Sequence, residues 1–241
     1  MVKLITRGDD AGSCDGANRA IQECISAGTL KNVSLMVPGP AFEAAAEMLR
    51  RHMDSIDIGL HVTLNSEWET FKWGPVSSDV PSLKDEGGWF TLSPGVLQER
   101  AFVLEEALRE VRAQIAKARA AGLRLDYLDE HMGIGWLPGL RDGLHQIAKE
   151  ERLRTLETFD FLPNPPTEGF LDYLSRLDEG PYVYVTHPGV DDATMNRFVH
   201  MGLEPGQIAR ERDAERLLLT SPPFKEAMAE GIFSVCRFSE A

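Results

Sequence analysis

The chain has 241 residues, of which 43% are hydrophobic and 26% charged, and its formal net charge at pH 7 is −13. These values are typical of a soluble globular protein with one large or two small domains. The acidic balance argues against nucleic-acid and anionic-membrane partners, because both need a basic face, and it is compatible with a neutral ligand, a cationic ligand or a carboxylate-rich metal site.

The cysteines and the N-terminal sequence indicate where the protein acts. Cys14, Cys24 and Cys236 cannot form a disulfide framework, and no C-x-x-C pair is present for a zinc knuckle or a redox motif. Met1 leads directly into an apolar strand, without the charged and long apolar regions of a signal peptide, and no apolar run is long enough to span a bilayer. We therefore expect a protein of the reducing cytoplasm.

The first part of the chain alternates short β-branched segments with amphipathic helical segments. Gly28 follows the first helical segment as a stop, and Pro38 follows the second strand. In chain order the sequence predicts a strand at 2–6, a helix at 15–27, a strand at 33–37, a helix at 42–53 and a strand at 56–64.

The stretch 65–95 differs from the rest, because it is rich in Gly and Pro and has no sustained period. It contains Trp68, Trp73 and Trp89. Long loops inside a compact domain are usually lids or binding loops, so we expect one of these roles here.

The remainder of the chain returns to alternating strands and helices. The sequence predicts helices at 96–121, 140–151, 170–177, 213–219 and 223–230, a loop at 163–166, and strands at 125–128, 155–161, 182–186 and 232–238. Alternation of this kind implies parallel strands joined by crossover helices. We expect one α/β domain over 1–241, built as a closed or nearly closed (β/α) TIM-like barrel.

Polar side chains gather at the C-terminal ends of the predicted strands, which converge on one face of an α/β barrel. Asp9 and Asp10 follow the first strand, and His61 lies late in the third. Asp129 and His131 follow the strand predicted at 125–128, and His187 follows the strand predicted at 182–186.

Two imidazoles and a carboxylate make a site for a divalent metal with open positions for water and substrate. Asp10, His61 and His131 are the candidate ligands. Asp9 is the candidate base that takes the proton of a metal-activated water, and His187 is the candidate acid that protonates the leaving group.

Each of these residues also has an ordinary structural interpretation. Asp9 and Asp10 lie between glycines and fit a solvated turn, since Asp caps backbone amides. His61 alone fits a hydrogen-bonded core histidine. His131 precedes a Gly-rich loop, and the Pro-Gly pair after His187 fits a strand-ending turn. The coincidence of four such groups at strand ends favours the metal site.

Residues 6–18, with the sequence TRGDDAGSCDGAN, resemble the opening of the YdjC-like carbohydrate deacetylase family, which includes the chitooligosaccharide deacetylases. Four further stretches are similar to the family and follow in order: SLMVPGPAF at 34–42, IGLHVTL at 58–64, THPG at 186–189 and LLTSP at 218–222. The resemblance implies a distorted β/α barrel that binds a divalent metal and hydrolyses the acetamide of an amino sugar. It implies that Asp10, His61 and His131 hold the metal, that Asp9 is the base, and that His187 aids catalysis.

The chain departs from the family pattern at several positions. Arg7 and Gly8 stand where Asn-Ala is common, and Ala11 replaces an aromatic residue. Gly133 and Gly135 stand where the family often has histidines after the metal ligand.

The substrate predicted from the resemblance is a small carbohydrate, namely an N-acetylated amino sugar or a short oligosaccharide. Tryptophans can stack on sugar rings, although they can equally pack within loops. The candidate substrate-binding residues are Arg7, Trp68, Trp73, Trp89, Asp129 and Trp136.

Other functions stay open at this point. One is a sugar-binding barrel that has lost catalysis, and another is a metal-dependent amidase acting on a different amide. The cofactor expected for a hydrolase is one divalent ion, magnesium or zinc, and two histidines favour zinc or a similar metal. A homodimer is expected on general grounds, because symmetric dimers are common.

Overall fold

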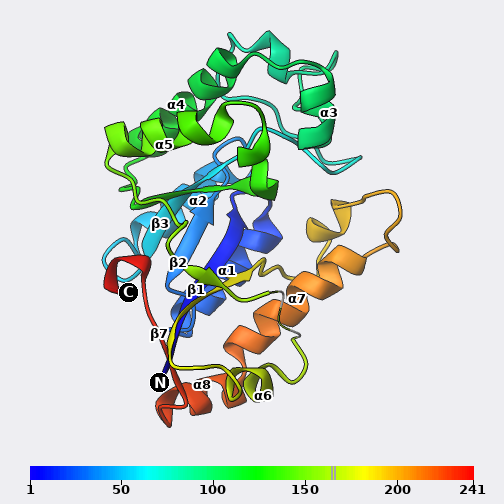
Figure 1. Cartoon of the computed structure of the whole chain (residues 1–241). Coiled ribbons are helices and arrows are strands. Elements are labelled where there is room, and N and C mark those ends of the chain that lie inside the picture. Colours follow the sequence, from blue (N-terminus) through cyan, green and yellow to red (C-terminus); the bar gives the residue numbers. More distant parts are fainter. Residues whose placement is uncertain (164, 166) are drawn as a thin grey trace.

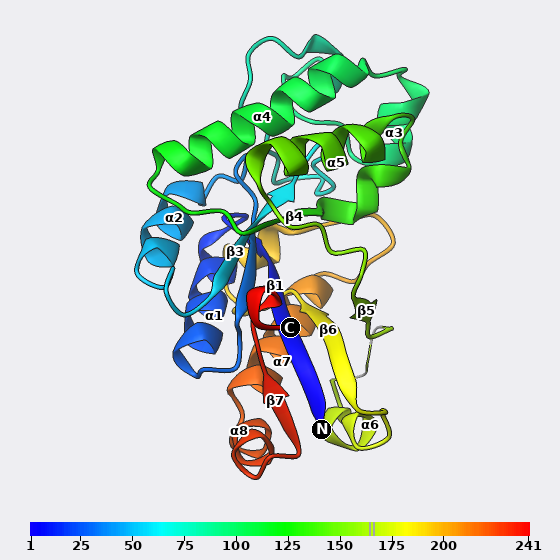
Figure 2. The same cartoon turned by 60° about the vertical axis from the view of Figure 1, so that its left-hand side comes forward.

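The computed structural model describes residues 1–163, 165 and 167–241, and its centre is one sheet of seven parallel strands in the order β4-β3-β2-β1-β6-β5, with β7 paired to β1 (Figures 1 and 2). The central strand β1 pairs with β6 along Val2–Gly8 and with β2 from Arg7 onward. The strands are β1 (Val2–Ala11), β2 (Asn32–Leu35), β3 (Asp57–Val62), β4 (Tyr127–Glu130), β5 (Asp160–Phe161), β6 (Gly180–Thr186) and β7 (Phe233–Val235).

The sheet curls into a distorted barrel, as predicted. The segment after β4 runs between the two edges of the sheet. In this segment, Arg154 forms a single parallel bridge with Tyr127 of β4. Further along the same segment, β5 pairs with β6. The barrel is therefore nearly closed at the N-terminal end of β4, and it opens between β4 and β5 nearer their C-terminal ends.

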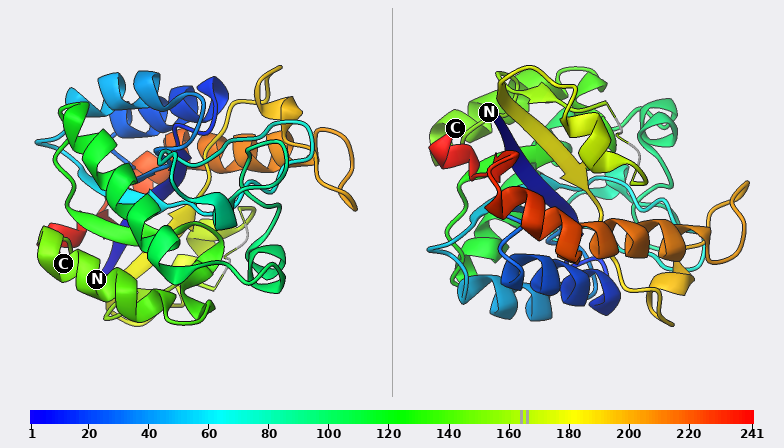
Figure 3. Two further views of the ribbon diagram at one scale, coloured as in Figure 1. Left: turned by 90° about the horizontal axis from the view of Figure 1, so that it is seen from above. Right: turned by 90° about the horizontal axis from the view of Figure 1, so that it is seen from below.

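Helices cover the outside of the curled sheet. α1 packs against α2 and α7, and α4 packs against α5, so segments far apart in the sequence lie side by side (Figures 1 and 3). The helices are α1 (Asp15–Ser26), α2 (Phe42–Arg50), α3 (Pro94–Glu99), α4 (Leu104–Ala120), α5 (Leu140–Glu151), α6 (Phe170–Leu174), α7 (Gln207–Thr220) and α8 (Pro222–Ala229). None of the described helices is long and apolar enough to cross a membrane.

Two apolar clusters account for the burial of alternate strand residues. Leu4 on one side of β1 belongs to the large cluster beneath the helices. Ile5 on the other side packs inside the barrel with Tyr127, Val183 and Phe238. Burial on both faces explains why the strands read as continuous apolar runs in the sequence.

Several predicted boundaries are wrong in instructive ways. β1 extends to Ala11, so Asp9 and Asp10 lie within the strand and not after it. The predicted helix at 96–121 is two helices, because Ala101 has a φ of 54° and the Val103 N–H donates to Ser82 Oγ instead of continuing α3.

Other elements differ mainly in length. The strand predicted at 155–161 is reduced to β5, the helix predicted at 213–219 begins earlier, at Gln207, and the last strand is shorter than 232–238. The predicted loop at 163–166 includes Asn164 and Pro166, which lie outside the described residues.

The stretch 65–95 is a long loop with one short helical turn, Pro81–Leu83. It is well packed, since Trp73, Leu83 and Phe90 are buried within it. The carboxylate of Glu110 on α4 accepts the backbone N–H groups of residues 76 and 77 at 2.9 and 2.8 Å. A lid role for this segment stays a prediction.

Candidate metal centre

A β-bulge at the end of β1 directs two adjacent carboxylates into the barrel. The pairing register with β2 shifts between Gly8 and Ala11, and Asp10 has a φ of 65°. Regular strand residues alternate between faces, whereas the bulge rotates Asp10 toward the side that Asp9 already faces. A non-glycine residue in the left-handed region is strained, and such strain is often found at functional sites.

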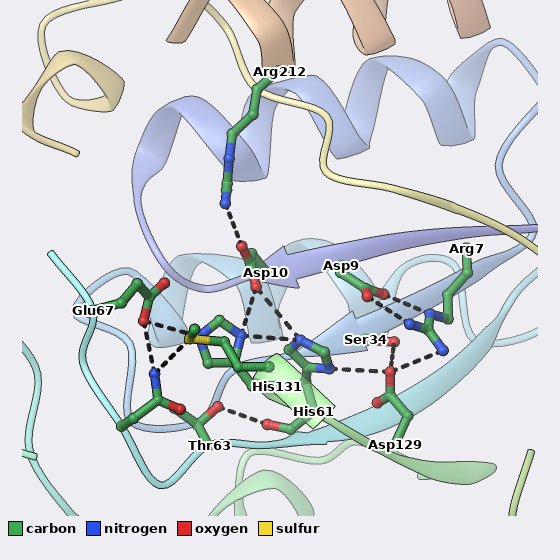
Figure 4. A network of polar contacts seen from close by, with 12 residues as sticks. Arg7, Asp9, Asp10, Ser34, His61, Thr63, Glu67, Asp129, His131 and Arg212 are labelled. Atoms are coloured by element: carbon green, nitrogen blue, oxygen red, sulfur yellow. Dashed lines mark hydrogen bonds and ion pairs between the residues drawn. The ribbon is translucent and has the colours of Figure 1, made fainter. Parts of the chain in front are cut away.

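Asp10, His61 and His131 meet at the C-terminal end of the barrel (Figure 4). Asp10 Oδ1 lies 3.5 Å from His61 Nε2 and 3.3 Å from His131 Nδ1, and the two nitrogens are 3.3 Å apart. Ligand atoms bound to one tetrahedral metal at about 2.1 Å lie about 3.4 Å from each other. The three side chains therefore fit a divalent ion.

The Asp10 carboxylate supports this fit. Its Oδ2 accepts a hydrogen bond from Arg212 Nη2 at 2.7 Å. Its Oδ1 is fully buried and accepts no hydrogen bond from any residue that the structure describes. Buried carboxylate oxygens are normally satisfied, so an oxygen left open toward two imidazoles indicates a place for a cation.

A carboxylate contacts the outer nitrogen of each imidazole. His61 Nδ1 lies 3.0 Å from Asp129 Oδ2, which also accepts a hydrogen bond from Ser34 Oγ at 3.0 Å. His131 Nε2 lies 3.0 Å from Glu67 Oε2.

Arg7 fills the neighbouring position in the barrel. Its Nε and Nη2 donate to the two oxygens of Asp9, each at 2.7 Å, and its Nη1 lies 3.2 Å from Asp129 Oδ2. Asp9, His61 and Asp129 also lie close enough to hold an ion. A guanidinium group, Arg7, already forms ion pairs with both carboxylates of that second group. No guanidinium contacts Asp10 Oδ1 among the described residues, so the group with Asp10 is the better cation site.

The balance of charge in the site is negative. Asp9, Asp10, Glu67 and Asp129 are buried carboxylates. Among the described residues, the guanidinium groups that form ion pairs with them are Arg7, with Asp9 and Asp129, and Arg212, with Asp10. When ionised, these four carboxylates carry two more charges than the two guanidiniums, so this group of residues attracts a cation.

The excess of negative charge raises the pKa values of both histidines. Burial alone would lower the pKa of His61, but Asp129, Asp9 and Asp10 outweigh it and hold that pKa well above its usual range. Burial is likewise outweighed at His131, where Glu67 and Asp10 raise the pKa to about 9. At Asp10 the burial effect is outweighed by Arg212 and the two histidines, which keep its pKa well below the usual value. The site thus favours positive charge at the position between these three residues.

The candidate metal ligands line a surface cavity of about 370 Å³. Its wall brings together the three candidate ligands, the candidate base Asp9 and the candidate acid His187, and also one candidate substrate-binding residue, Trp68. His187 is held beside it through its backbone N–H, which donates to Glu215 on α7. The full lining is Asp9, Asp10, His61, Glu67, Trp68, Glu130, His131, Met132, His187 and Arg212.

The other candidate substrate-binding residues lie elsewhere. Trp73 is buried, and its indole N–H donates to the Asn65 carbonyl at 2.7 Å. Trp89 and Trp136 are exposed and do not line this cavity. Arg7 and Asp129 line a separate cavity at the opening between β4 and β5.

Sequence reasoning missed Glu67 and Arg212, which contact the candidate metal ligands, and also Glu130 and Met132, which line the cavity. Glu67 lies in the long loop, where no period indicates a buried side chain. Arg212 lies on α7, whose charged residues occur on all sides and read as solvent-exposed. A buried arginine in such a helix has no local signature.

Comparisons with known proteins give one family and several named relatives. The sequence profile of YdjC-like proteins matches residues 3–230. A carbohydrate deacetylase of Brevibacillus brevis is 29% identical over 255 residues, covering 99% of each chain. A carbohydrate deacetylase of Mus musculus is 35% identical over 143 residues, which are 58% of this chain and 44% of that protein.

Solved structures share the fold. A protein of Enterococcus faecalis V583 named for cellobiose-phosphate cleavage superposes with a TM-score of 0.82 at 24% identity, covering 99% of this chain and 98% of the other. A mutant of a CE4 family pseudoenzyme with restored enzymatic activity gives a TM-score of 0.52 at 14% identity, covering 98% of this chain and 66% of the other.

Proposed function

This chain belongs to the YdjC-like protein family, and we propose that it is a metal-dependent hydrolase that removes the acetyl group from an N-acetylated amino sugar or a short oligosaccharide. The observation that carries the proposal is the triangle of Asp10, His61 and His131 at the wall of an open cavity, with one carboxylate oxygen left without a hydrogen bond among the described residues. The relatives named as carbohydrate deacetylases support the choice of substrate class.

Asp10 Oδ1, His61 Nε2 and His131 Nδ1 would hold the ion, and two nitrogen ligands favour zinc or a similar metal over magnesium. The chemistry that a divalent ion supplies in such a site is polarisation of a carbonyl oxygen and acidification of water.

Asp9 is the proton acceptor in this proposal. Its carboxylate is buried and faces the cavity, and Arg7 fixes its plane through both oxygens. An ionised carboxylate offers about four acceptor positions, so each oxygen can still accept a proton from water. Asp9 takes that proton while the water oxygen bonds to the amide carbon.

His187 supplies the proton that the departing nitrogen needs. It lines the same cavity as Asp9 but comes from the end of β6, so the two groups approach the substrate from different elements. When the C–N bond breaks, the amine leaves with the proton from His187, and acetate remains. Trp68 borders this cavity, but it is buried and stacks on Phe198 with ring centroids 4.8 Å apart, so its main role is packing.

The test is release of acetate from N-acetylglucosamine and from its β-1,4-linked dimer by zinc-loaded protein. Acetate together with a free amine, identified by mass, is the expected result. Saturable sugar binding without any product would instead indicate a sugar-binding barrel. Turnover of other amides without action on these sugars would indicate a different amidase.

A further inference from the structure

Glu67 belongs to the long loop at 65–95, yet the residue is buried, with 7% of its surface exposed. Its Oε2 lies 3.0 Å from His131 Nε2 and accepts a hydrogen bond from Asn65 Nδ2 at 3.1 Å. A carboxylate accepts hydrogen bonds but cannot donate them when ionised, so His131 must carry a proton on Nε2 for this contact to be favourable.

This contact determines which nitrogen of His131 can bind a metal. With Nε2 protonated, the neutral ring presents the lone pair of Nδ1, and Nδ1 is the atom 3.3 Å from Asp10 Oδ1. His61 has the opposite arrangement, because Asp129 contacts its Nδ1 and leaves Nε2 toward Asp10. The two histidines thus face the same point through different ring nitrogens, each set by its own carboxylate.

The loop around Glu67 is built to keep this carboxylate in place. The Asn65 carbonyl accepts the indole N–H of Trp73 at 2.7 Å, and Ser66 Oγ accepts the Trp73 backbone N–H at 3.1 Å. Trp73 is itself buried. Residues 65–73 therefore form a closed unit that presents Glu67 to the metal centre.

We propose that Glu67 is a positioning residue of the metal centre: it fixes His131 as an Nδ1 ligand and makes the start of the 65–95 loop part of the ion-binding site. This inference rests on the proposed function for the presence of the metal, but it concerns the role of a residue outside the ligand set.

Carboxylates that orient metal-binding histidines typically contribute 10- to 100-fold to metal affinity. We therefore expect Glu67→Ala to weaken zinc affinity by about 10- to 100-fold. Glu67→Gln keeps an acceptor oxygen but loses the charge, so a smaller loss is expected. Glu69→Gln is the matched control, because it makes the same change two residues away on an exposed side chain.

The experiment is competition for Zn²⁺ between the full chain and a chromophoric chelator, without substrate, combined with ¹⁵N-histidine NMR of the zinc-loaded protein. The expected spectra show His131 protonated at Nε2 and His61 protonated at Nδ1, with the His131 signals changed in Glu67→Ala. Circular dichroism checks that each variant is folded. If Glu67→Ala does not fold, the zinc affinity of Glu67→Gln is compared with that of the wild type instead.

Zinc affinities that are equal in wild type, Glu67 variants and the Glu69 control would overturn the positioning role. Spectra with His131 bound to zinc through Nε2 would do the same, and both results would leave the metal-dependent hydrolase intact. Failure of the wild type to bind zinc or another divalent ion would overturn the proposed function as well.

Discussion

Arg7 holds the Asp9 carboxylate by both oxygens, with donor–acceptor distances of 2.7 Å from Nε to Oδ1 and from Nη2 to Oδ2. Arginine can make this planar, two-point contact, and lysine cannot. The orientation of the proposed base therefore depends on the arginine at position 7.

We predict that Arg7→Lys lowers kcat for deacetylation by about 10²-fold, because a small misplacement of a catalytic group has an effect of this size. The positive charge beside Asp9 and Asp129 is kept, so zinc content is expected to stay at the wild-type level. Steady-state kinetics and elemental analysis on the same preparation measure both quantities. Unchanged kcat would show that the two-point contact is not needed to place Asp9.

Asp9→Asn is expected to retain zinc and to lose turnover by about 10²- to 10⁴-fold, the usual contribution of a general base. The amide has nearly the same shape as the carboxylate but accepts no proton. Acetate release per bound zinc is the appropriate measure. Wild-type rates in this variant would remove Asp9 from the role of base.

His131→Ala is expected to abolish tight zinc binding, because it deletes one of three ligand side chains. The wild type should bind about one ion per chain after removal and reloading of metal. His200→Ala, which changes an exposed histidine, is the control and should bind like the wild type. Elemental analysis after gel filtration distinguishes these outcomes, and equal content in all three proteins would argue against the site.

Glu110 gives a prediction about pH and stability far from the metal. Burial raises the pKa of its carboxyl above the ordinary 4.5, despite hydrogen bonds from Gln114 and from the backbone of Ser77 and Val76. A raised folded-state pKa means that the folded protein binds the proton more tightly. The contribution of Glu110 to stability is therefore full below pH 4.5 and is lost as pH rises through the folded-state pKa.

The expected result is that Glu110→Gln gains stability relative to wild type as pH rises from about 4 to 7. Urea unfolding at several pH values measures the free energies of unfolding. Glu105→Gln, on the exposed side of the same helix, should show no such trend. A constant difference between Glu110→Gln and wild type would mean that the carboxyl titrates normally in the folded protein.

Gly59 on β3 lies directly under the Tyr127 ring, and a Cβ at this position would come within 2.1 Å of the ring. Gly59→Ala is expected to destabilise the protein by about 1–3 kcal/mol, as overpacked core positions do. Gly95→Ala is the control, because its nearest neighbouring atom would be 3.7 Å away. Urea unfolding should separate the two variants clearly, and equal stabilities would show that Tyr127 moves aside freely.

The parallel barrel and the gathering of its polar residues were predictable, because they follow from the period of the apolar residues and from the rule that strand ends converge on one face. Element boundaries that depend on distant contacts were not. The break between α3 and α4 lies among ordinary helix-forming residues. It is set by Ser82 of the long loop, whose Oγ accepts a hydrogen bond from the Val103 N–H. The residue pattern within 96–121 does not predict that contact.

The predicted metal ligands come together in space, but the groups around them escaped sequence reasoning. Asp129, a candidate substrate-binding residue, contacts His61, Arg7 and Ser34. Arg212 reaches Asp10 from 202 positions away along the chain. Such roles depend on which side chains the fold buries next to each other, and that information is not present in short motifs.

The bulge at Asp10 has a consequence for transplanting this site by design. Copying two consecutive aspartates into a regular strand of another parallel barrel would send one of them outward, because strand residues alternate. The irregular pairing between Gly8 and Ala11 would have to be copied as well. What a designer must graft is thus a backbone shape four residues long, and the Asp-Asp dipeptide is functional only on that shape.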